Sequence, residues 1–222
     1  TFTKNGVTYQ VTNTSPNEVQ VGSDDQGAAN EVLSGEIEIP SEIIASDGNS
    51  FTVTSVVNGA FYGCKNLKTI ALPNSVKEIG ARAFSDCSTL TMVTLPSQIE
   101  KISDGMFSDC KKLETITIPN TVTTIEDDAF FNCYSLTTVN MGTAVEHIGN
   151  LAFGNCNKVR SLTLPATLKT IADRGLAQMN GLEAITIPKS VKSIGKQALF
   201  FDSSLTSVTV ENGNTVYDSR NG

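Results

Sequence analysis

Cysteine is the residue type in this chain best suited to redox or metal chemistry, and its five copies recur every 23 residues. They are Cys64, Cys87, Cys110, Cys133 and Cys156. Thiols in such a column could form disulfides or bind a metal. An odd number leaves at least one thiol free, and parallel side chains on stacked copies would hold the Cβ atoms ~4.8 Å apart, longer than a bridge prefers. We expect buried free thiols, with a disulfide or a metal site as the alternatives.

Carboxylates form a second column with the same interval. Stacked carboxylates can recruit calcium, which prefers oxygen ligands. Asp and Asn are also the preferred residues for capping the first turn of a helix, and the sequence lacks the glycine-rich ligand turns of calcium-binding solenoids. We expect helix capping, with calcium binding as the alternative. The residues concerned are Asp104, Asp127, Asn150 and Asp173, with Glu126 and Asp128 beside them.

Catalytic chemistry has little support in the sequence. The single histidine, His147, stands where other copies of the repeat have residues such as Glu78, Lys101 and Thr124, which indicates a surface position. No Gly-x-Ser-x-Gly, P-loop or His-Glu-x-x-His motif occurs. Only a hydrolase built on a pair of carboxylates stays open, because such pairs have no fixed spacing. We expect a protein that is not an enzyme and uses no cofactor.

Phenylalanine follows the same period and indicates how all these columns are positioned. A fixed repeat of this length is typical of a solenoid, in which one short unit stacks on copies of itself. Leucine, isoleucine and valine recur in register with it from residue 61 to about residue 210. The phenylalanines, which we expect to form the core, are Phe61, Phe84, Phe107, Phe130 and Phe153.

Each unit can be interpreted locally. Residues 67–72 end in an alternating apolar pattern closed by Pro73, which predicts a short strand and a turn. Residues 76–79 predict a second, shorter strand. The segment before each phenylalanine begins with Asp or Asn, which predicts one or two turns of helix with a side-chain cap. The expected fold is therefore an α/β solenoid of short parallel strands with one short helix per 23-residue coil.

The two ends of the chain depart from the period. An Asn-Gly turn at Asn5 and Gly6 between alternating segments predicts a β-hairpin, so residues 1–36 are expected to cap the first coil. Residues 23–30 are expected to form a polar loop. The solenoid is expected over residues 37–210, with about ten inserted residues forming a loop near 41–50. Residues 211–222 are expected to be either a C-terminal cap or the truncated start of a further repeat.

The repeat unit, L-x-x-I-x-L/I-P-x-x-V-x-x-I-x-x-x-A-F-x-x-C, resembles the leucine-rich repeats of the BspA-like family of bacterial surface proteins over residues 37–221. The resemblance implies a right-handed leucine-rich repeat solenoid. It also implies surface exposure and adhesion to host or bacterial partners. The pattern lapses at Leu176, Met179, Leu199 and Asp202, so the last two coils are expected to pack differently.

Composition restricts the partners. The net charge of −7 argues against nucleic-acid binding, which normally needs a basic surface. No apolar stretch approaches the ~20 residues of a membrane span. We expect an extracellular or cell-surface location, as the resemblance implies, and because the chain opens with polar residues rather than a signal peptide, we expect the targeting segment to be absent from it.

The outward positions of the longer strands are the residues free to recognise a partner. They form a flat, hydroxyl-rich surface, and we expect a host or bacterial surface protein or a glycan to bind at its central coils. The alternative is that the threonines serve only strand formation and the domain is a structural spacer. Aromatic and aliphatic residues outside the ladders, Phe131, Tyr134 and Leu151 with Phe200 and Phe201, are the competing patch. The candidate binding residues are Glu114, Thr117, Thr137, Asn140, Arg160 and Thr163.

Overall fold

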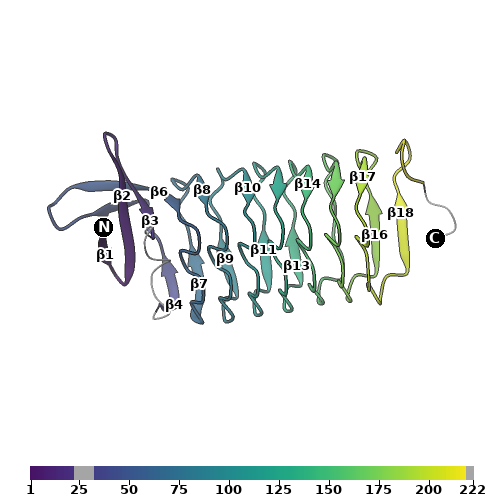
Figure 1. Ribbon diagram of the computed structural model, residues 1–222, viewed down its shortest axis with the longest axis horizontal. Helices are drawn as coiled ribbons and strands as arrows, with labels where there is room; N and C mark the ends of the chain where they lie inside the picture. Colours follow the sequence, from purple (N-terminus) through teal and green to yellow (C-terminus); the bar gives the residue numbers. More distant parts are fainter. Residues whose placement is uncertain (23–32, 219–222) are drawn as a thin grey trace.

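The protein is an elongated stack of coils with the first and last strands at opposite ends (Figure 1). The computed structural model describes residues 1–22 and 33–218, so the expected polar loop at 23–30 lies outside the described residues. Each coil has three sides: a longer strand, a second short strand, and a segment of turns that leads to the next longer strand. Parallel pairing between successive coils holds the stack together.

The longer strands form what we call the main sheet. Its order is β13-β11-β9-β7-β4, and neighbours pair in parallel at an offset of 23 residues in the regular part, as in Thr117 with Asn140. The sheet is then interrupted. Ser161 makes only an isolated bridge to Ala184, and β16 pairs with β18 beyond it. The strands are β4 (Ser34–Glu38), β7 (Asn66–Ala71), β9 (Met92–Thr94), β11 (Thr115–Thr117), β13 (Thr138–Asn140), β16 (Ala184–Ile187) and β18 (Ser207–Val210).

The second side carries strands of only two residues. They run in the order β10-β12-β14-β15-β17, again in parallel, and each points one isoleucine inward. These strands are β8 (Glu78–Ile79), β10 (Lys101–Ile102), β12 (Thr124–Ile125), β14 (His147–Ile148), β15 (Thr170–Ile171) and β17 (Ser193–Ile194).

A mixed sheet covers the N-terminal end of the stack. Its order is β1-β2-β3-β6-β5, and β8 of the first regular coil also pairs with β6. Asn5 and Gly6 both have positive φ at the β1–β2 turn, which is the geometry that lets a two-residue hairpin follow the twist of its strands. Residues 41–50 contain a strand that pairs back on β6. The strands are β1 (Phe2–Lys4), β2 (Val7–Thr14), β3 (Asn17–Val21), β5 (Glu42–Ile44) and β6 (Ser50–Val56).

The third side is not a helix, so the expectation of one short helix per coil is wrong. The described residues contain no helix, and this side consists of successive turns. Within residues 105–110 the backbone N–H groups alternate. Those of Gly105, Phe107 and Asp109 donate to carbonyls of the next coil at 2.8–2.9 Å, and the intervening ones donate three residues back in their own coil. We call this side the turn face.

Left-handed residues explain why the turn face cannot be helical. Asp128 and Asn132, four residues apart in one coil, have φ of 51° and 61°. A right-handed helix requires negative φ throughout, so two such residues limit any helix to less than one turn. Both positions repeat with positive φ in the neighbouring coils, including Arg82 and Asp86, and Leu151 and Asn155. The geometry is therefore a property of the repeat.

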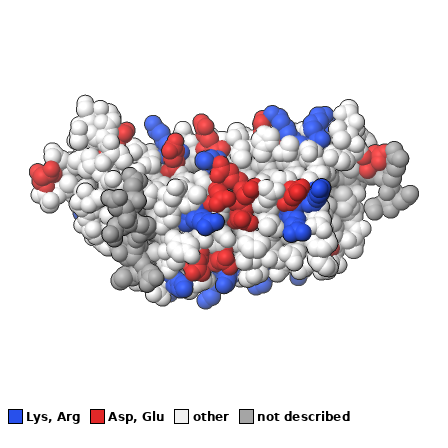
Figure 2. Space-filling view, viewed as in Figure 1, with Lys and Arg blue, Asp and Glu red and all other residues white. Residues whose placement is uncertain are grey.

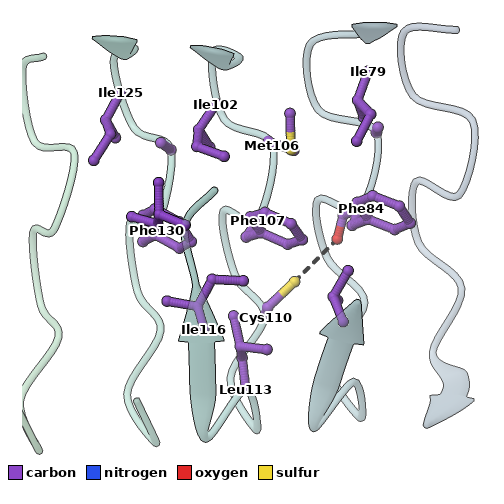
Figure 3. Packing of buried hydrophobic residues seen from close by; sticks show 14 of the residues in the cluster. Ile79, Phe84, Ile102, Met106, Phe107, Cys110, Leu113, Ile116, Ile125 and Phe130 are labelled. Carbon is purple, nitrogen blue, oxygen red and sulfur yellow. Dashed lines mark hydrogen bonds between the residues drawn. The ribbon is translucent and has the colours of Figure 1, made fainter. Parts of the chain in front are cut away.

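Phenylalanine forms the central spine of the core, as expected. The rings of Phe61, Phe84, Phe107, Phe130 and Phe153 are fully buried and stack with centroids 5.1–5.4 Å apart and planes within 13° of parallel. Figure 3 shows the rings of Phe84, Phe107 and Phe130 between isoleucines of the second strands on one side and, on the other, Leu113 and the main-sheet residue Ile116. All three sides of each coil thus contact the same ladder.

We predict that Phe107→Ala lowers the free energy of unfolding by about 3–5 kcal/mol, because it leaves a cavity between two neighbouring rings. Denaturant midpoints measure the change. Thr163→Ala, on an exposed position, is the control and should change stability by no more than about 0.5 kcal/mol. A Phe107→Ala loss as small as that of the control would place the ring outside the core.

Some coils approach each other so closely that only glycine fits. The Asp127 Oδ1 atom accepts a hydrogen bond from the backbone N–H of Asn150 in the next coil at 2.7 Å. A Cβ atom on the preceding residue, Gly149, would lie 2.6 Å from that oxygen and 2.7 Å from the Asp127 nitrogen. Gly80 and Gly195 stand in the same relation to an Asn and an Asp one coil before them.

We predict that Gly149→Ala lowers the free energy of unfolding by about 1–3 kcal/mol, because the Asp127 backbone must move to admit the methyl group. Thermal or chemical denaturation measures the loss. Ala172→Gly tests the same repeat position in the opposite direction and should cost at most about 1 kcal/mol through chain entropy alone. Equal effects of the two substitutions would contradict a steric origin.

Candidate functional site

The cysteine column has a structural role in this fold. All five thiols are free and buried. Four of them donate to the carbonyl oxygen of the phenylalanine 26 residues earlier; for example, the Cys110 Sγ atom lies 3.1 Å from the Phe84 oxygen, as Figure 3 shows. The others are Cys87, Cys133 and Cys156, at 3.0–3.3 Å from their acceptors. The thiol therefore adds a second hydrogen bond to a carbonyl group beside the core ring, which already accepts a backbone N–H of its own coil.

Burial also makes these thiols poor nucleophiles. It raises the pKa of the Cys110, Cys133 and Cys156 thiols above the ordinary value for cysteine. The thiolate is the reactive and metal-binding form, so the fold suppresses both kinds of chemistry. The described residues contain no group of three or more His, Cys, Asp or Glu side chains placed to hold a metal ion.

We predict that no cysteine reacts rapidly with a thiol reagent in native buffer and that all five react together after unfolding without reductant. Burial beside the phenylalanine ladder is the physical reason. A chromogenic disulfide reagent with and without denaturant measures both states. Fast modification of several thiols in the folded protein would contradict buried thiols, and fewer than five reacting after unfolding would indicate a disulfide.

The carboxylate column caps backbone groups between coils, so the expectation of helix capping is also wrong. In the part of the chain that the structure describes there is no helix to cap, and Asp127 and Asp173 accept backbone N–H groups of the following coil, from Asn150 and Lys196, each at 2.7 Å. The side-chain amide of Asn150 also donates a hydrogen bond to the Asp127 carboxylate, at 2.8 Å. Asp104 uses its backbone N–H to bind the Glu126 carboxylate at 2.9 Å.

The Asp and Asn residues immediately before the cysteines behave differently. Asp86, Asp109, Asn132 and Asn155 all adopt positive φ, which these residue types tolerate best after glycine. Their side chains form a ladder between coils, with Asn132 donating to Asp109 and Asn155 donating to Asn132 at 3.1 and 2.8 Å. This column serves the turn geometry.

His147 lies on the second sheet and is partly exposed. Its Nδ1 atom is 2.8 Å from the Thr170 hydroxyl and its Nε2 atom is 3.8 Å from the Glu146 carboxylate. The Lys169 ammonium, 2.6 Å from the same carboxylate, accounts for most of the lowered pKa of Glu146. These contacts join adjacent coils along one ridge of the surface.

The six predicted binding residues are all exposed on the side of the main sheet. We call them the central sheet patch: Glu114, Thr117, Thr137, Asn140, Arg160 and Thr163. They fall into two columns at the 23-residue interval, one beginning at Glu114 and the other at Thr117. The structure brings them together across three adjacent coils.

Hydrogen bonds within the central sheet patch fix part of it. The Thr137 hydroxyl donates to the Glu114 carbonyl oxygen and the Asn140 amide donates to the Thr117 hydroxyl, both at 3.0 Å. Thr91 and Thr206 make the same hydroxyl-to-carbonyl bond in their coils. Some of the threonines on this face therefore stabilise the stacking of coils.

Arg160 and Thr163 lie where the main sheet is interrupted, a feature that the regular sequence pattern did not indicate. Residues 160–163 form no strand apart from the single bridge at Ser161. The ion pairs among the described residues do not involve Arg160 or Glu114. Both charges are therefore available to a partner at this face.

The competing aromatic residues separate into two places. Phe131 and Leu151 are half-buried and both contact the space above Gly154, where a Cβ atom would lie 3.0 and 3.1 Å from their side chains. Tyr134 is 38% exposed in the same part of the turn face. Phe200 and Phe201 are exposed at the last coil, and their ring centroids are 4.2 Å apart.

The lapses in the repeat have different consequences in the last two coils. Leu176 and Met179 replace phenylalanine and cysteine and remain fully buried. Asp202 replaces the next cysteine and is half-buried, with its Oδ1 atom accepting the Met179 N–H at 2.7 Å. Burial raises the pKa of Asp202 to about 6. The second lapse thus places a carboxyl group where earlier coils have an apolar one.

These features define a repeat protein whose coils form a parallel β-solenoid with no enclosed catalytic constellation among the residues described. The BspA type leucine rich repeat region family model matches residues 36–158 and 132–220, with six copies of the repeat. The chain therefore belongs to the BspA-type leucine-rich repeat family, as the sequence indicated. A search of the curated proteins finds no match.

Solved structures share the fold. A leucine rich cell surface protein from Faecalibacterium prausnitzii is 26% identical over 99% of this chain, with a TM-score of 0.83. This chain spans 56% of that protein's length. A leucine rich repeat protein from T. pallidum is 27% identical, with a TM-score of 0.76, and the match covers 92% of this chain and 90% of that one. The pneumococcal vaccine antigen PcpA, at 24% identity and a TM-score of 0.61, shares the fold over 99% of this chain and 52% of its own.

The described residues include no helix long and apolar enough to cross a membrane. The chain is thus a leucine-rich repeat domain of the bacterial surface-protein type, a class of binding or structural domains.

Proposed function

We propose that the chain is a non-catalytic adhesion domain of a bacterial cell-surface protein, which binds a host or bacterial surface protein or a glycan through the central sheet patch. The main support for this proposal is that the patch is exposed and presents acidic, basic, amide and hydroxyl side chains on three adjacent coils. Solenoids typically bind through such extended faces. The surface-protein description of the structural relative from F. prausnitzii supports the location.

The contacts within the patch support recognition. The bond between Asn140 and Thr117 holds an amide group in a defined orientation, so less side-chain entropy is lost on binding. Arg160 adds a charge with five possible donors, and arginine is enriched among the residues that dominate binding energy. Neither residue contributes to the apolar core.

A structural spacer is the second candidate function. The hydroxyl-to-carbonyl bonds of Thr91, Thr137 and Thr206 support it, because they show threonines that stabilise the stack. A spacer requires no partner at the main sheet. Binding by the intact domain, followed by substitution of the patch, distinguishes the two functions.

We predict that Arg160→Glu and Asn140→Arg each weaken binding at least tenfold, equivalent to about 1.4 kcal/mol, without changing the circular dichroism spectrum or melting temperature. A glycan array and a panel of purified host extracellular-matrix proteins identify the ligand, and biolayer interferometry measures affinity.

The matched control is Tyr134→Ala, which changes an exposed residue on the turn face. Normal binding by both patch variants, with binding lost in Phe131→Ala or Tyr134→Ala, would assign recognition to the turn face. Absence of binding to any glycan or protein tested would favour the spacer.

A further inference from the structure

One ridge on the turn face carries charges in an ordered sequence. Regular coils have two left-handed residues on this face, and the ridge consists of the first of them in each coil together with the residue before it. The left-handed residues, whose φ lies between 49° and 56°, are Arg82, Gly105, Asp128, Leu151, Arg174 and Gln197. The residues before them are Ala81, Asp104, Asp127, Asn150, Asp173 and Lys196. We call these twelve residues the turn-face ridge.

The net charge of the ridge differs in sign on the two sides of Leu151: Arg82, Asp104, Asp127 and Asp128 before it sum to −2, and Asp173, Arg174 and Lys196 after it sum to +1. Asp128 lies one coil before Leu151 and Asp104 two coils before it, whereas Arg174 lies one coil after it and Lys196 two coils after it. Figure 2 shows acidic side chains gathered over the middle of the solenoid, with basic side chains on both sides of them. Asp127 and Asp173 direct their carboxylates along the stack to cap the next coil.

The charges on both halves are poorly compensated within the chain. Among the described residues Asp104 makes one ion pair, with Arg82 at 3.8 Å, and burial together with Asp104 and Asp127 raises the pKa of Asp128, with Arg82 partly opposing the shift. On the other half, the Arg174 Nε atom donates to the neutral Gln197 side chain at 2.8 Å. The ion pairs between described residues do not include Arg174 or Lys196.

The middle of the ridge is apolar. Leu151 stands at the left-handed position, where an aliphatic residue is unusual, and Phe131 contacts the same space above Gly154. Both side chains are half-buried rather than part of the core. A small apolar centre between oppositely charged flanks has the layout of a protein interface.

We propose that the turn-face ridge is a self-complementary surface on which a second copy of this chain docks antiparallel, about a twofold axis at Leu151. The rotation places each coil before Leu151 opposite the coil equally far after it. Asp128 then faces the partner's Arg174 and Asp104 faces the partner's Lys196, whereas Asp127 faces the partner's Asp173, with each of these two carboxylates capping the next coil of its own stack. Each contact occurs twice, and the pairing closes as a dimer.

The size of the ridge sets the expected strength. With the twofold axis at Leu151, five coils overlap, those from Gly105 to Gln197, and at ~4.8 Å per coil with a face about 20 Å wide they give a contact on the order of 500 Å² per copy, below the usual value for a stable complex. The dimer should therefore be weak, and because its charges are exposed, it should weaken further as salt rises. The central sheet patch lies on the main sheet, so both copies keep it available.

The experiment is sedimentation of the purified chain across a concentration series at low and high salt. The substitutions use residue types that this left-handed position already accepts, since Arg occupies it at Arg82 and Arg174 and Asp occupies it at Asp128. Asp128→Arg and Arg174→Asp each place like charges opposite one another. We expect each to weaken the dimer at least tenfold.

Two combinations test the pairing itself. The double variant Asp128→Arg/Arg174→Asp exchanges the two signs and should dimerise like the parent chain. An equimolar mixture of the two single variants should form heterodimers, because each copy then meets its opposite. Glu114→Arg, on the main sheet, is the control and should leave the dimer unchanged.

The outcomes are decisive in either direction. Dimerisation weakened by either single variant and restored in the mixture supports the proposed register. A chain that stays monomeric at about 1 mM in low salt overturns the proposal. A dimer that is indifferent to both single variants overturns it as well, because another face then forms the contact. None of these measurements depends on the adhesion partner, so the adhesion proposal can fail or succeed separately.

Discussion

Backbone hydrogen bonding between successive coils is the constraint on which the rest of this structure depends. On the turn face every second N–H group leaves its own coil for the next one, as at Gly105, Phe107 and Asp109. This requirement keeps corresponding residues of adjacent coils in register at an interval of 23. It therefore dictates that a residue type repeated in sequence becomes a column in space.

Columns explain why residues associated with catalysis or metal binding act structurally here. A cysteine beside the core ring finds a carbonyl acceptor in the preceding coil, and an aspartate at the coil edge finds a backbone donor in the following one. The cysteine gives a second donor to a carbonyl that already accepts a backbone N–H, and the aspartate supplies an acceptor for an N–H at the coil edge. Asp202 is the exception, since its raised pKa reflects a carboxyl group in a place that suits an apolar side chain.

The main sheet and the turn face present different kinds of surface. The main sheet presents short polar side chains on a flat surface, whereas the turn face presents charges in an order that changes along the stack. The same periodicity that fixes the core leaves both surfaces variable from coil to coil. A single repeat architecture can therefore carry a partner-binding face and a self-association face without altering its interior.

The amino-acid sequence by itself determined the period, the family, the phenylalanine core and the buried free cysteines, because apolar residues recur in one register and only stacking can bury them. It could not reveal the turn face, since Asp and Asn at segment starts suit both a helix cap and a cap between coils. The tertiary structure decided between these through the left-handed residues Asp128 and Leu151, whose conformation is imposed by hydrogen bonds to the neighbouring coils. The interruption of the main sheet at residues 160–163, where Ser161 makes a single bridge, is likewise visible only in the tertiary structure, because the apolar positions of this coil keep the regular pattern.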